Sequence, residues 1–272
     1  ATDPDADRVG VEVLQKDGSY LNLSGNQIGA IMAKYILEAH KNAGTLPENA
    51  ALCKSIVSTD LVTKIAESYG ATMFNVLTGF KFIAEKIQEF EEKHNHTYMM
   101  GFEESFGYLI KPFVRDKDAI QAVLVVAELA AYYRSRGLTL ADGIEEIYKE
   151  YGYYAEKTIS VTLSGVDGAE QIKAIMAKFR NNAPKEWNAT EITVVEDFKA
   201  QTSTAADGTV TALTTPPSDV LKYTLADGSW IAVRPSGTEP KIKFYIAVVG
   251  ESNEDSQAKI ANIEDEINAF VK

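Results

Sequence analysis

Hydrophobic residues in the first 151 positions change their spacing several times, and the changes predict alternating strands and helices. Apolar and polar side chains alternate over residues 9–14 and 20–23, on either side of a polar turn, which predicts a β-hairpin. Apolar residues at three- and four-residue spacing then predict a helix over residues 28–39. Further strands are predicted at residues 51–58, 71–77 and 98–103, and further helices between Asp60 and Gly70 and at residues 82–93, 118–133 and 141–151. This alternation predicts an α/β domain in which helices flank a mostly parallel sheet.

From about Gly152 onward the pattern changes, and strands are predicted to dominate. A hairpin is predicted from residues 223–225 and 230–233, which flank the turn A-D-G-S. Other strands are predicted at residues 158–163, 191–198 and 241–249, and helices at residues 169–180 and 254–270. The stretch 200–219 is rich in Thr, Ser, Gly and Pro and predicts a mobile surface loop. The sequence therefore predicts a smaller α+β domain with an antiparallel sheet after the first domain.

Composition and charge narrow the functional classes. With 45% hydrophobic and 24% charged residues, the chain has the composition of an ordinary soluble globular protein. Its net charge of -12 argues against binding to nucleic acid or to an anionic membrane, because both need a basic surface. The single cysteine, Cys53, excludes an internal disulfide and is expected to be a buried small hydrophobe in a reducing compartment. No segment suits a membrane span, so we expect a cytoplasmic protein.

The string D-P-D-A-D-R at residues 3–8 predicts a divalent-cation loop. Asp3, Asp5 and Asp7 alternate along an extended segment, so their carboxylates can converge on one hard cation such as Mg2+, with Arg8 behind them to meet an anion. A calcium helix-loop-helix is excluded, because its sixth and twelfth positions would be Arg8 and Leu14 instead of Gly and Glu. A D-x-D pair also serves aspartyl-phosphate phosphotransferases and nucleotide-sugar metal sites, and a solvated acidic segment is the plain structural alternative.

The string R-P-S-G-T-E-P-K, between two predicted strands, predicts a phosphate-binding loop. Arg234 offers a planar fork for phosphate, and Ser236 and Thr238 offer hydroxyls. Gly237 could let backbone N–H groups approach an anion closely. An ordinary hairpin loop has a similar composition, and the arginine favours the phosphate interpretation.

The string G-F-E-E-S-F-G-Y places Glu103 and Ser105 at a predicted strand end between aromatic residues, which suits carboxylate contacts to sugar hydroxyls. Acids at a helix N-terminus are the structural alternative. Lys81, shortly after Gly79, is a further candidate, with a surface lysine at a helix start as the alternative. His94 and His96 have no third ligand nearby, so a solvated loop is favoured over a metal site there.

These strings, in this order, resemble the α-D-phosphohexomutase family of phosphoglucomutases and phosphomannomutases. The resemblance covers essentially the whole chain but corresponds only to the C-terminal half of the family, from the end of its second domain to its fourth. It implies that residues 1–14 end a metal-binding domain, that residues 15–151 form a sugar-binding domain, and that residues 152–272 form a phosphate-binding domain.

The resemblance also implies a role for each matching residue. It assigns Mg2+ binding to Asp3, Asp5 and Asp7, an active-site role to Arg8, sugar binding to Gly79, Phe80, Lys81, Glu103 and Ser105, and phosphate binding to Arg234, Ser236, Gly237 and Thr238. The family moves a phosphoryl group between the 1- and 6-positions of a hexose through a bisphosphorylated sugar, so glucose 1,6-bisphosphate is the implied activator and intermediate.

Two departures from the family pattern affect the expected activity. The phosphoserine donor of the family lies in a T-A-S-H-N-P-like loop, and no such string occurs in this sequence. Some members have His after the sugar-binding string, where this chain has Phe106 and Gly107, so no general base is assigned. We therefore expect part of a phosphoglucomutase-type enzyme that is inactive alone and needs a missing N-terminal half to act on a hexose phosphate. A phosphomannomutase and a non-catalytic phosphosugar-binding module remain the alternatives.

Overall fold

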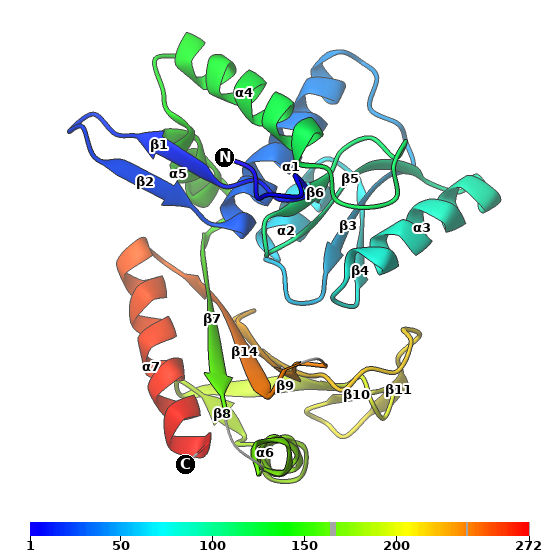
Figure 1. Ribbon diagram of the computed structural model, residues 1–272, viewed down its shortest axis with the longest axis vertical. Helices are drawn as coiled ribbons and strands as arrows, with labels where there is room; N and C mark the ends of the chain where they lie inside the picture. The colour runs from blue at the N-terminus through cyan, green and yellow to red at the C-terminus, as the bar shows by residue number, and fades with distance from the viewer. Residues whose placement is uncertain (164–166, 238, 272) are drawn as a thin grey trace. The chain divides into compact units, whose positions relative to one another are not determined.

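The computed structural model describes residues 1–163, 167–237 and 239–271, and the chain divides into two compact units. Unit 1 is Ala1–Tyr151 and unit 2 begins at Gly152 (Figure 1). Unit 1 combines helices with a mixed sheet, and unit 2 is built on an antiparallel sheet. The fold class predicted from the sequence is confirmed.

Unit 1 is an α/β structure around the sheet order β4-β3-β5-β6. Its elements are β1 (Val11–Leu14), β2 (Tyr20–Leu23), α1 (Gly25–Asn42), β3 (Ala50–Ser55), α2 (Leu61–Ser68), β4 (Thr72–Val76), α3 (Phe80–Lys93), β5 (Thr97–Glu103), β6 (Gly107–Leu109), α4 (Ala119–Ser135) and α5 (Leu140–Tyr151). Strands β4 and β5 run parallel to β3, as expected, whereas β1 and β2 form the predicted antiparallel hairpin. The three-residue β6, antiparallel to β5, was not predicted, because it is fully buried and shows no alternation.

Helix α1 lies at the centre of unit 1 and begins with a complete capping box. Ser24 Oγ accepts the N–H of Gln27, and the Gln27 side chain accepts the N–H of Ser24. The helix contacts α2, α4, α5 and β5, so it is buried on several sides rather than along one stripe. A Cβ on Gly25 would lie 2.0 Å from the carbonyl oxygen of Glu104, so only glycine allows the helix to pack this close to the loop after β5.

Unit 2 is a sheet in the order β11-β10-β9-β12-β13-β14-β7, in which neighbouring strands in the described residues are antiparallel. Its elements are β7 (Tyr153–Thr162), α6 (Gly168–Asn182), β8 (Glu186–Trp187), β9 (Thr190–Asp197), β10 (Thr202–Ala205), β11 (Val210–Ala212), β12 (Leu221–Leu225), β13 (Trp230–Pro235), β14 (Lys241–Gly250) and α7 (Asn253–Val271). Side chains of α6 and α7, among them Phe179 and Ile263, form one core with Val233 and Phe244 of the sheet. The prediction of a mobile surface loop at residues 200–219 is wrong in part, because β10 and β11 form a hairpin there that extends β9. Threonine-rich segments pair well at a sheet edge, and this tertiary pairing outweighs their loop-like composition.

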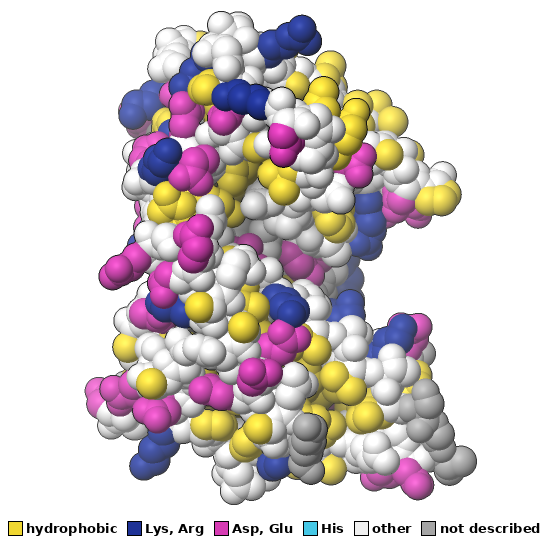
Figure 2. Space-filling model, turned by 90° about the vertical axis from the view of Figure 1, so that its left-hand side faces the viewer, with side chains coloured by type: hydrophobic (Ala, Val, Ile, Leu, Met, Phe, Trp, Pro, Cys, Tyr) yellow, Lys and Arg dark blue, Asp and Glu magenta, His cyan; other side chains and the backbone are white. Residues whose placement is uncertain are grey.

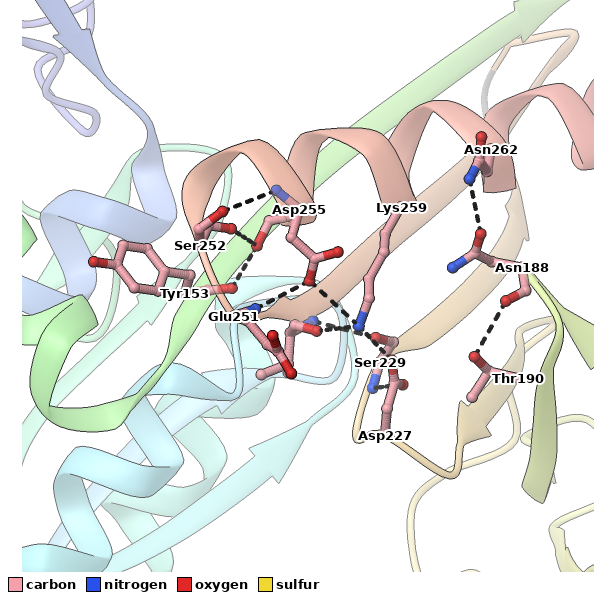
Figure 3. A network of polar contacts seen from close by, with 12 residues as sticks. Tyr153, Asn188, Thr190, Asp227, Ser229, Glu251, Ser252, Asp255, Lys259 and Asn262 are labelled. Atoms are coloured by element: carbon pink, nitrogen blue, oxygen red, sulfur yellow. Dashed lines mark hydrogen bonds and ion pairs between the residues drawn. The ribbon is translucent and has the colours of Figure 1, made fainter.

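A polar network attaches the first half of α7 to the sheet (Figure 3). Lys259 Nζ donates to Asp227 Oδ2 at 2.9 Å and to the carbonyl oxygen of Val249 at 2.7 Å. Ser256 Oγ donates to the carbonyl oxygen of Tyr153 at 2.7 Å. These contacts tie the first half of α7 to the start of β7, to the end of β14 and to the turn between β12 and β13.

Charged side chains of both signs are scattered over the face that Figure 2 presents. None of the helices in the described ranges is long and apolar enough to cross a membrane. Cys53 is fully buried, and burial raises the pKa of its thiol to about 12, so its predicted role as a small hydrophobe is confirmed.

Candidate functional site

The acidic loop before β1 folds back on itself through its own carboxylate. Asp3 Oδ1 accepts the N–H groups of Asp7 at 3.2 Å and Arg8 at 3.0 Å, and Ala6 adopts a left-handed φ of 57°. Burial works to raise the pKa of Asp3, but the N–H of Arg8 and a hydrogen bond with Asp5 outweigh it, so this pKa is lowered. Oxygens of Asp3, Asp5 and Asp7 lie within 4.8 Å of one another. The structure therefore brings the three predicted metal ligands together.

The donor atoms of this cluster fit a hard divalent cation. Asp7 Oδ1 is buried and accepts no hydrogen bond from the described residues, although Arg8 Nε lies 3.5 Å away. A buried carboxylate oxygen without a donor is costly, and a cation would satisfy it. Three carboxylates in this arrangement are the type of oxygen ligand that Mg2+ prefers.

Lys117, which the sequence analysis did not identify, forms ion pairs at the acidic cluster. Its Nζ lies 3.0 Å from Asp7 Oδ2 and 2.8 Å from Asp116 Oδ1, and its side chain is 11% exposed. Burial alone would lower the pKa of Lys117, but the hydrogen bonds to Asp116 and Asp7 raise it overall. The string D-K-D is common on protein surfaces, so only the tertiary structure identifies this lysine.

The acidic loop is joined to the loop between β5 and β6, although the two are far apart in the sequence. Arg8 Nη1 donates to the carbonyl oxygen of Ser105 at 2.6 Å, across 97 residues. The N–H of Val9 donates to the carbonyl oxygen of Phe106 at 3.2 Å, and Arg8 forms an isolated antiparallel bridge with Gly107. Two motifs that the sequence suggested separately are thus one continuous surface in unit 1.

The candidate sugar residues occupy different environments. Glu103, at the end of β5, is 7% exposed, and its Oε1 accepts the N–H of Gly79 at 2.6 Å. Burial raises the pKa of Glu103, and the Gly79 N–H offsets only part of this rise.

Phe80 is 4% exposed and belongs to the core, so its ring is not available to a ligand. Lys81 is exposed, with its Nζ 4.8 Å from the centre of the Phe82 ring. The Ser105 hydroxyl makes no hydrogen bond among the described residues.

A buried polar network connects the loop between β5 and β6 to the end of β3. The N–H of Glu104 donates to Ser58 Oγ at 3.1 Å, and Glu104 Oε2 accepts Ser55 Oγ at 3.0 Å. Both serines lie at the carboxyl end of β3 and are fully buried. Next to them, the fully buried Lys54 pairs with Asp60 at 2.8 Å. Neighbouring strand ends therefore fix the position of this loop.

The predicted phosphate loop of unit 2 is held mainly by its own hairpin. The sequence predicted that Arg234 lies in this loop. In the structure it is the next-to-last residue of β13. The N–H of Ser236 donates to the carbonyl oxygen of Lys241 at 2.7 Å, and the N–H of Glu239 donates to Ser236 Oγ at 3.3 Å. Gly237 has no left-handed φ, and no atom lies within 4 Å of the position that a Cβ would take, so its backbone is open to approach by a ligand. Thr238 lies outside the described residues.

Lys243 lies opposite Arg234 and was missed by the sequence analysis. The two are direct partners in the pairing of β13 with β14, so their side chains leave the same face of the sheet. Neither forms an ion pair within the described ranges, and like charges in this position repel each other. An anion between them would remove the repulsion. The only local signal was the alternation K-I-K at residues 241–243.

Comparison with known proteins identifies the family. Residues 24–151 match the domain described as phosphoglucomutase/phosphomannomutase, alpha/beta/alpha domain III, and residues 167–269 match the C-terminal domain of the same family. The chain thus combines the third, alpha/beta/alpha domain of this family with its C-terminal domain. It belongs to the phosphoglucomutase/phosphomannomutase family.

A curated relative supports this assignment. The phosphoglucomutase of Staphylococcus aureus is 38% identical over 261 residues, which are 96% of this chain and 46% of that protein. The chain spans about half the length of the curated relatives it matches.

Solved structures share the fold at lower identity. Parafusin, a phosphoglucomutase from Paramecium, superposes with a TM-score of 0.66 at 19% identity, over 99% of this chain and 44% of that chain. The N-acetylphosphoglucosamine mutase of Aspergillus fumigatus, in complex with GlcNAc-6P and magnesium, gives a TM-score of 0.53 at 13% identity, over 100% of this chain and 48% of that chain. A variant of the same enzyme in complex with glucose 1,6-bisphosphate gives 0.52 at 14% identity, over 98% of this chain and 47% of that chain.

Proposed function

We propose that this chain is the C-terminal part of a phosphoglucomutase-type enzyme that interconverts hexose 1-phosphate and hexose 6-phosphate. The chain supplies metal, sugar and phosphate contacts, and the phosphoserine nucleophile comes from a part outside these 272 residues. The observation that carries the proposal is the junction of the acidic loop with the loop after β5, through Arg8 and Ser105. A carboxylate cluster beside free sugar-binding groups suits a substrate that carries both a phosphate and hydroxyls.

In this proposal the acidic loop holds Mg2+ through Asp3, Asp5 and Asp7. Bound Mg2+ would neutralise charge on the transferring phosphoryl group. Arg8 keeps part of its guanidinium exposed beside the cluster, at 41% side-chain exposure, and can bind a phosphate oxygen. Lys117 fixes Asp7 and limits the net negative charge of the loop in the absence of a cation.

The sugar is assigned to the surface next to this loop. Glu103 Oε1 is used by Gly79, which leaves Oε2 to accept a sugar hydroxyl, and the Ser105 hydroxyl is free to donate or accept. Gly79 and Lys81 would help to select the sugar, and the string G-F-K favours glucose over mannose. Phe80 would act only through its backbone, because its ring is in the core.

The non-reacting phosphate is assigned to Arg234, Ser236, Gly237 and Thr238, with Lys243 as an added partner. Glucose 1,6-bisphosphate is the proposed activator, which the complex of the Aspergillus fumigatus enzyme with this compound supports by analogy. The magnesium complex of that enzyme supports the proposed metal in the same way. The proposed location is the cytoplasm, where hexose phosphates are metabolised.

The test is conversion of glucose 1-phosphate with Mg2+ and glucose 1,6-bisphosphate present, using protein free of host mutase. We expect no turnover from the chain alone, because none of the proposed groups is the nucleophile. Turnover at the rate of an intact enzyme would overturn the assignment of the nucleophile to another part.

Sequencing the gene upstream of the codon for Ala1 separates the enzyme from the non-catalytic alternative. We expect an upstream T-A-S-H-N-P-like string in frame. An open reading frame that starts at these residues would favour a free-standing phosphosugar-binding module. Comparing the affinities for glucose 1-phosphate and mannose 1-phosphate separates the phosphoglucomutase from the phosphomannomutase.

A further inference from the structure

Unit 1 contains a cavity of about 490 Å³ at the edge of the sheet where β3 and β5 begin. The candidate sugar residues follow the opposite, carboxyl-terminal ends of β4 and β5, so this cavity is separate from the proposed site. Its volume is in the range of small-molecule sites. It is lined by the end of α3, the start of β5 and the segment after β6.

Three groups that can donate to an anion line the cavity and are not used elsewhere. The Nζ of Lys111 and the ring of His94 have no ion pair or side-chain hydrogen bond within the described part of the chain. Nδ1 of His96 is buried and has no hydrogen-bond partner there. Because this nitrogen is buried, Nε2 is the ring nitrogen of His96 left to meet a ligand. The protein has a net charge of -12, so basic groups without an acidic partner are candidates for binding an anion.

The segment that carries the two histidines is held in place by other residues. Asn49 Nδ2 donates to the carbonyl oxygen of Asn95 at 3.2 Å, and Asn49 Oδ1 accepts Thr97 Oγ1 at 2.9 Å. The His96 ring packs against Phe90 at 5.1 Å and against a second phenylalanine on β4, so it is half-buried, whereas His94 is exposed as the sequence predicted. His94 ends α3 with a left-handed φ of 51°. These contacts define the histidine side of the cavity.

Lys111 is fixed on the other side by the start of α4. The N–H of Lys111 donates to Gln121 Oε1 at 2.7 Å, and Gln121 Nε2 donates back to the carbonyl oxygen of Lys111 at 3.3 Å. Gln121 is itself held by Asp118 Oδ2 at 2.9 Å, and Asp118 caps the helix. The backbone of Lys111 is therefore positioned by a clamp, and its ammonium group is left for a ligand.

The remaining lining is apolar or already neutralised. Pro112 contributes apolar surface, Ile87 and Phe90 are core side chains with only 1% and 3% exposed, and the hydroxyl of Tyr98 is used by the carbonyl oxygen of Leu109 at 2.9 Å. The carboxylate of Glu91 is paired with Arg115, so it does not leave an uncompensated negative charge at the cavity. The cavity thus combines apolar lining with the exposed and uncommitted Lys111 and His94.

We propose that this cavity binds a small organic anion, a carboxylate or a phosphate monoester with an apolar body. The anionic group lies against Lys111, His94 and His96, and the body lies against Pro112. The site is independent of the proposed mutase function.

The probe is phenyl phosphate, with benzoate as the carboxylate arm and benzyl alcohol as the uncharged control. The chain has three histidines, so its imidazole NMR spectrum distinguishes His94 and His96 in the cavity from His40. We expect phenyl phosphate to shift both cavity histidines saturably below roughly 10 mM, with His40 unchanged. Benzyl alcohol should give no saturable shift. A response to benzoate as well would extend the ligand class to carboxylates, and its absence would restrict it to phosphate esters.

Variants then assign the binding to the cavity. Lys111→Gln should weaken phenyl phosphate at least about tenfold, the loss expected for one charged contact, and Lys111→Arg should keep most of the affinity. Lys16→Gln, at an exposed lysine in the β1–β2 turn, and Arg234→Ala are the matched controls and should leave the histidine shifts unchanged. No saturable shift, an unaltered affinity in Lys111→Gln, or loss of the shift in Arg234→Ala would each overturn the proposal.

Discussion

The two charged loops assigned to ligand binding differ in how they are held. Besides its internal hydrogen bonds to Asp3, the acidic loop of unit 1 makes long-range contacts, from Arg8 to Ser105, from Val9 to Phe106 and from Asp7 to Lys117. The phosphate loop of unit 2 is fixed by contacts within its own hairpin, between Ser236, Glu239 and Lys241.

Substitutions in the two loops should therefore affect folding and binding differently. A loop held by distant residues depends on the packing of its whole unit, so changes far from it in the sequence should alter both folding and binding. A loop at the end of a hairpin depends on its two strands, so a change in it should alter binding with little effect on folding. Matched substitutions in the two loops test this directly.

The largest expected effect is on the unit 1 loop. Gly25→Ala should lower the free energy of unfolding by about 3 kcal/mol, because the new Cβ would lie 2.0 Å from the carbonyl oxygen of Glu104 and would push the loop after β5 away. Gly237→Ala in unit 2 is the matched control and should change it by less than about 0.5 kcal/mol, because no atom lies within 4 Å. Denaturant unfolding measures both. Equal effects would contradict the comparison.

The next largest effect should be on phosphate binding in unit 2. Arg234→Ala should lower sugar-phosphate affinity by about 1.5 to 3 kcal/mol, or roughly ten- to a hundredfold, with an unchanged melting temperature. Arg234→Lys should recover only part of the loss, because an ammonium group lacks the two-pronged geometry. Titration calorimetry and a thermal melt measure the two quantities. A melt that collapses in Arg234→Ala would show that the arginine is structural.

A smaller effect is expected for the metal. Mg2+ binding should be weak, because Lys117 already occupies Asp7 Oδ2, and Asp5→Asn should weaken it further by roughly tenfold. Asp207→Asn, at an exposed turn of unit 2, is the matched control and should leave the affinity unchanged. Calorimetry with Mg2+ measures it. Tight binding that survives Asp5→Asn would place the cation elsewhere.

The smallest effect is a difference in pH dependence between the units. In unit 1 the raised pKa of Glu103 favours its protonated form in the folded state, so its contribution to stability falls as the pH rises from 4.5 through the folded pKa. In unit 2 the pKa of Asp197 is lowered, because hydrogen bonds from Arg180 and the Ala200 N–H outweigh burial. Its contribution is complete above pH 3.8 and is lost as the pH falls through the folded pKa.

Thermal melts across pH test these signs. Relative to the wild type, Glu103→Gln should gain stability as the pH rises above 4.5. The stability deficit of Asp197→Asn should shrink as the pH falls below 3.8. The same pH trend in both variants would contradict the assigned environments.

Much of the fold could be predicted from the sequence. Strand and helix periodicity predicted the fold class, because the spacing of apolar residues along one buried face is a local property of the sequence. Prediction from the sequence failed at β6, β10 and β11, because pairing with a neighbouring strand decides the structure there. The environments of individual side chains were also not predictable. Phe80 is in the core and His96 is packed against phenylalanines, and neither is visible in the local pattern.

By itself, the sequence determined which chemical groups are present and in what order. It gave the three alternating aspartates, the acids and serine after a strand, and the arginine-led loop, because charge and hydrogen-bonding capacity belong to the residues themselves. Only the tertiary structure decided which groups meet. Distant chain segments come together when apolar surface is buried. This burial pairs Arg8 with Ser105 and Lys117 with Asp7, and it places Arg234 opposite Lys243. The cavity between Lys111 and the two histidines has the same origin, since burial fixes positions that no local spacing encodes.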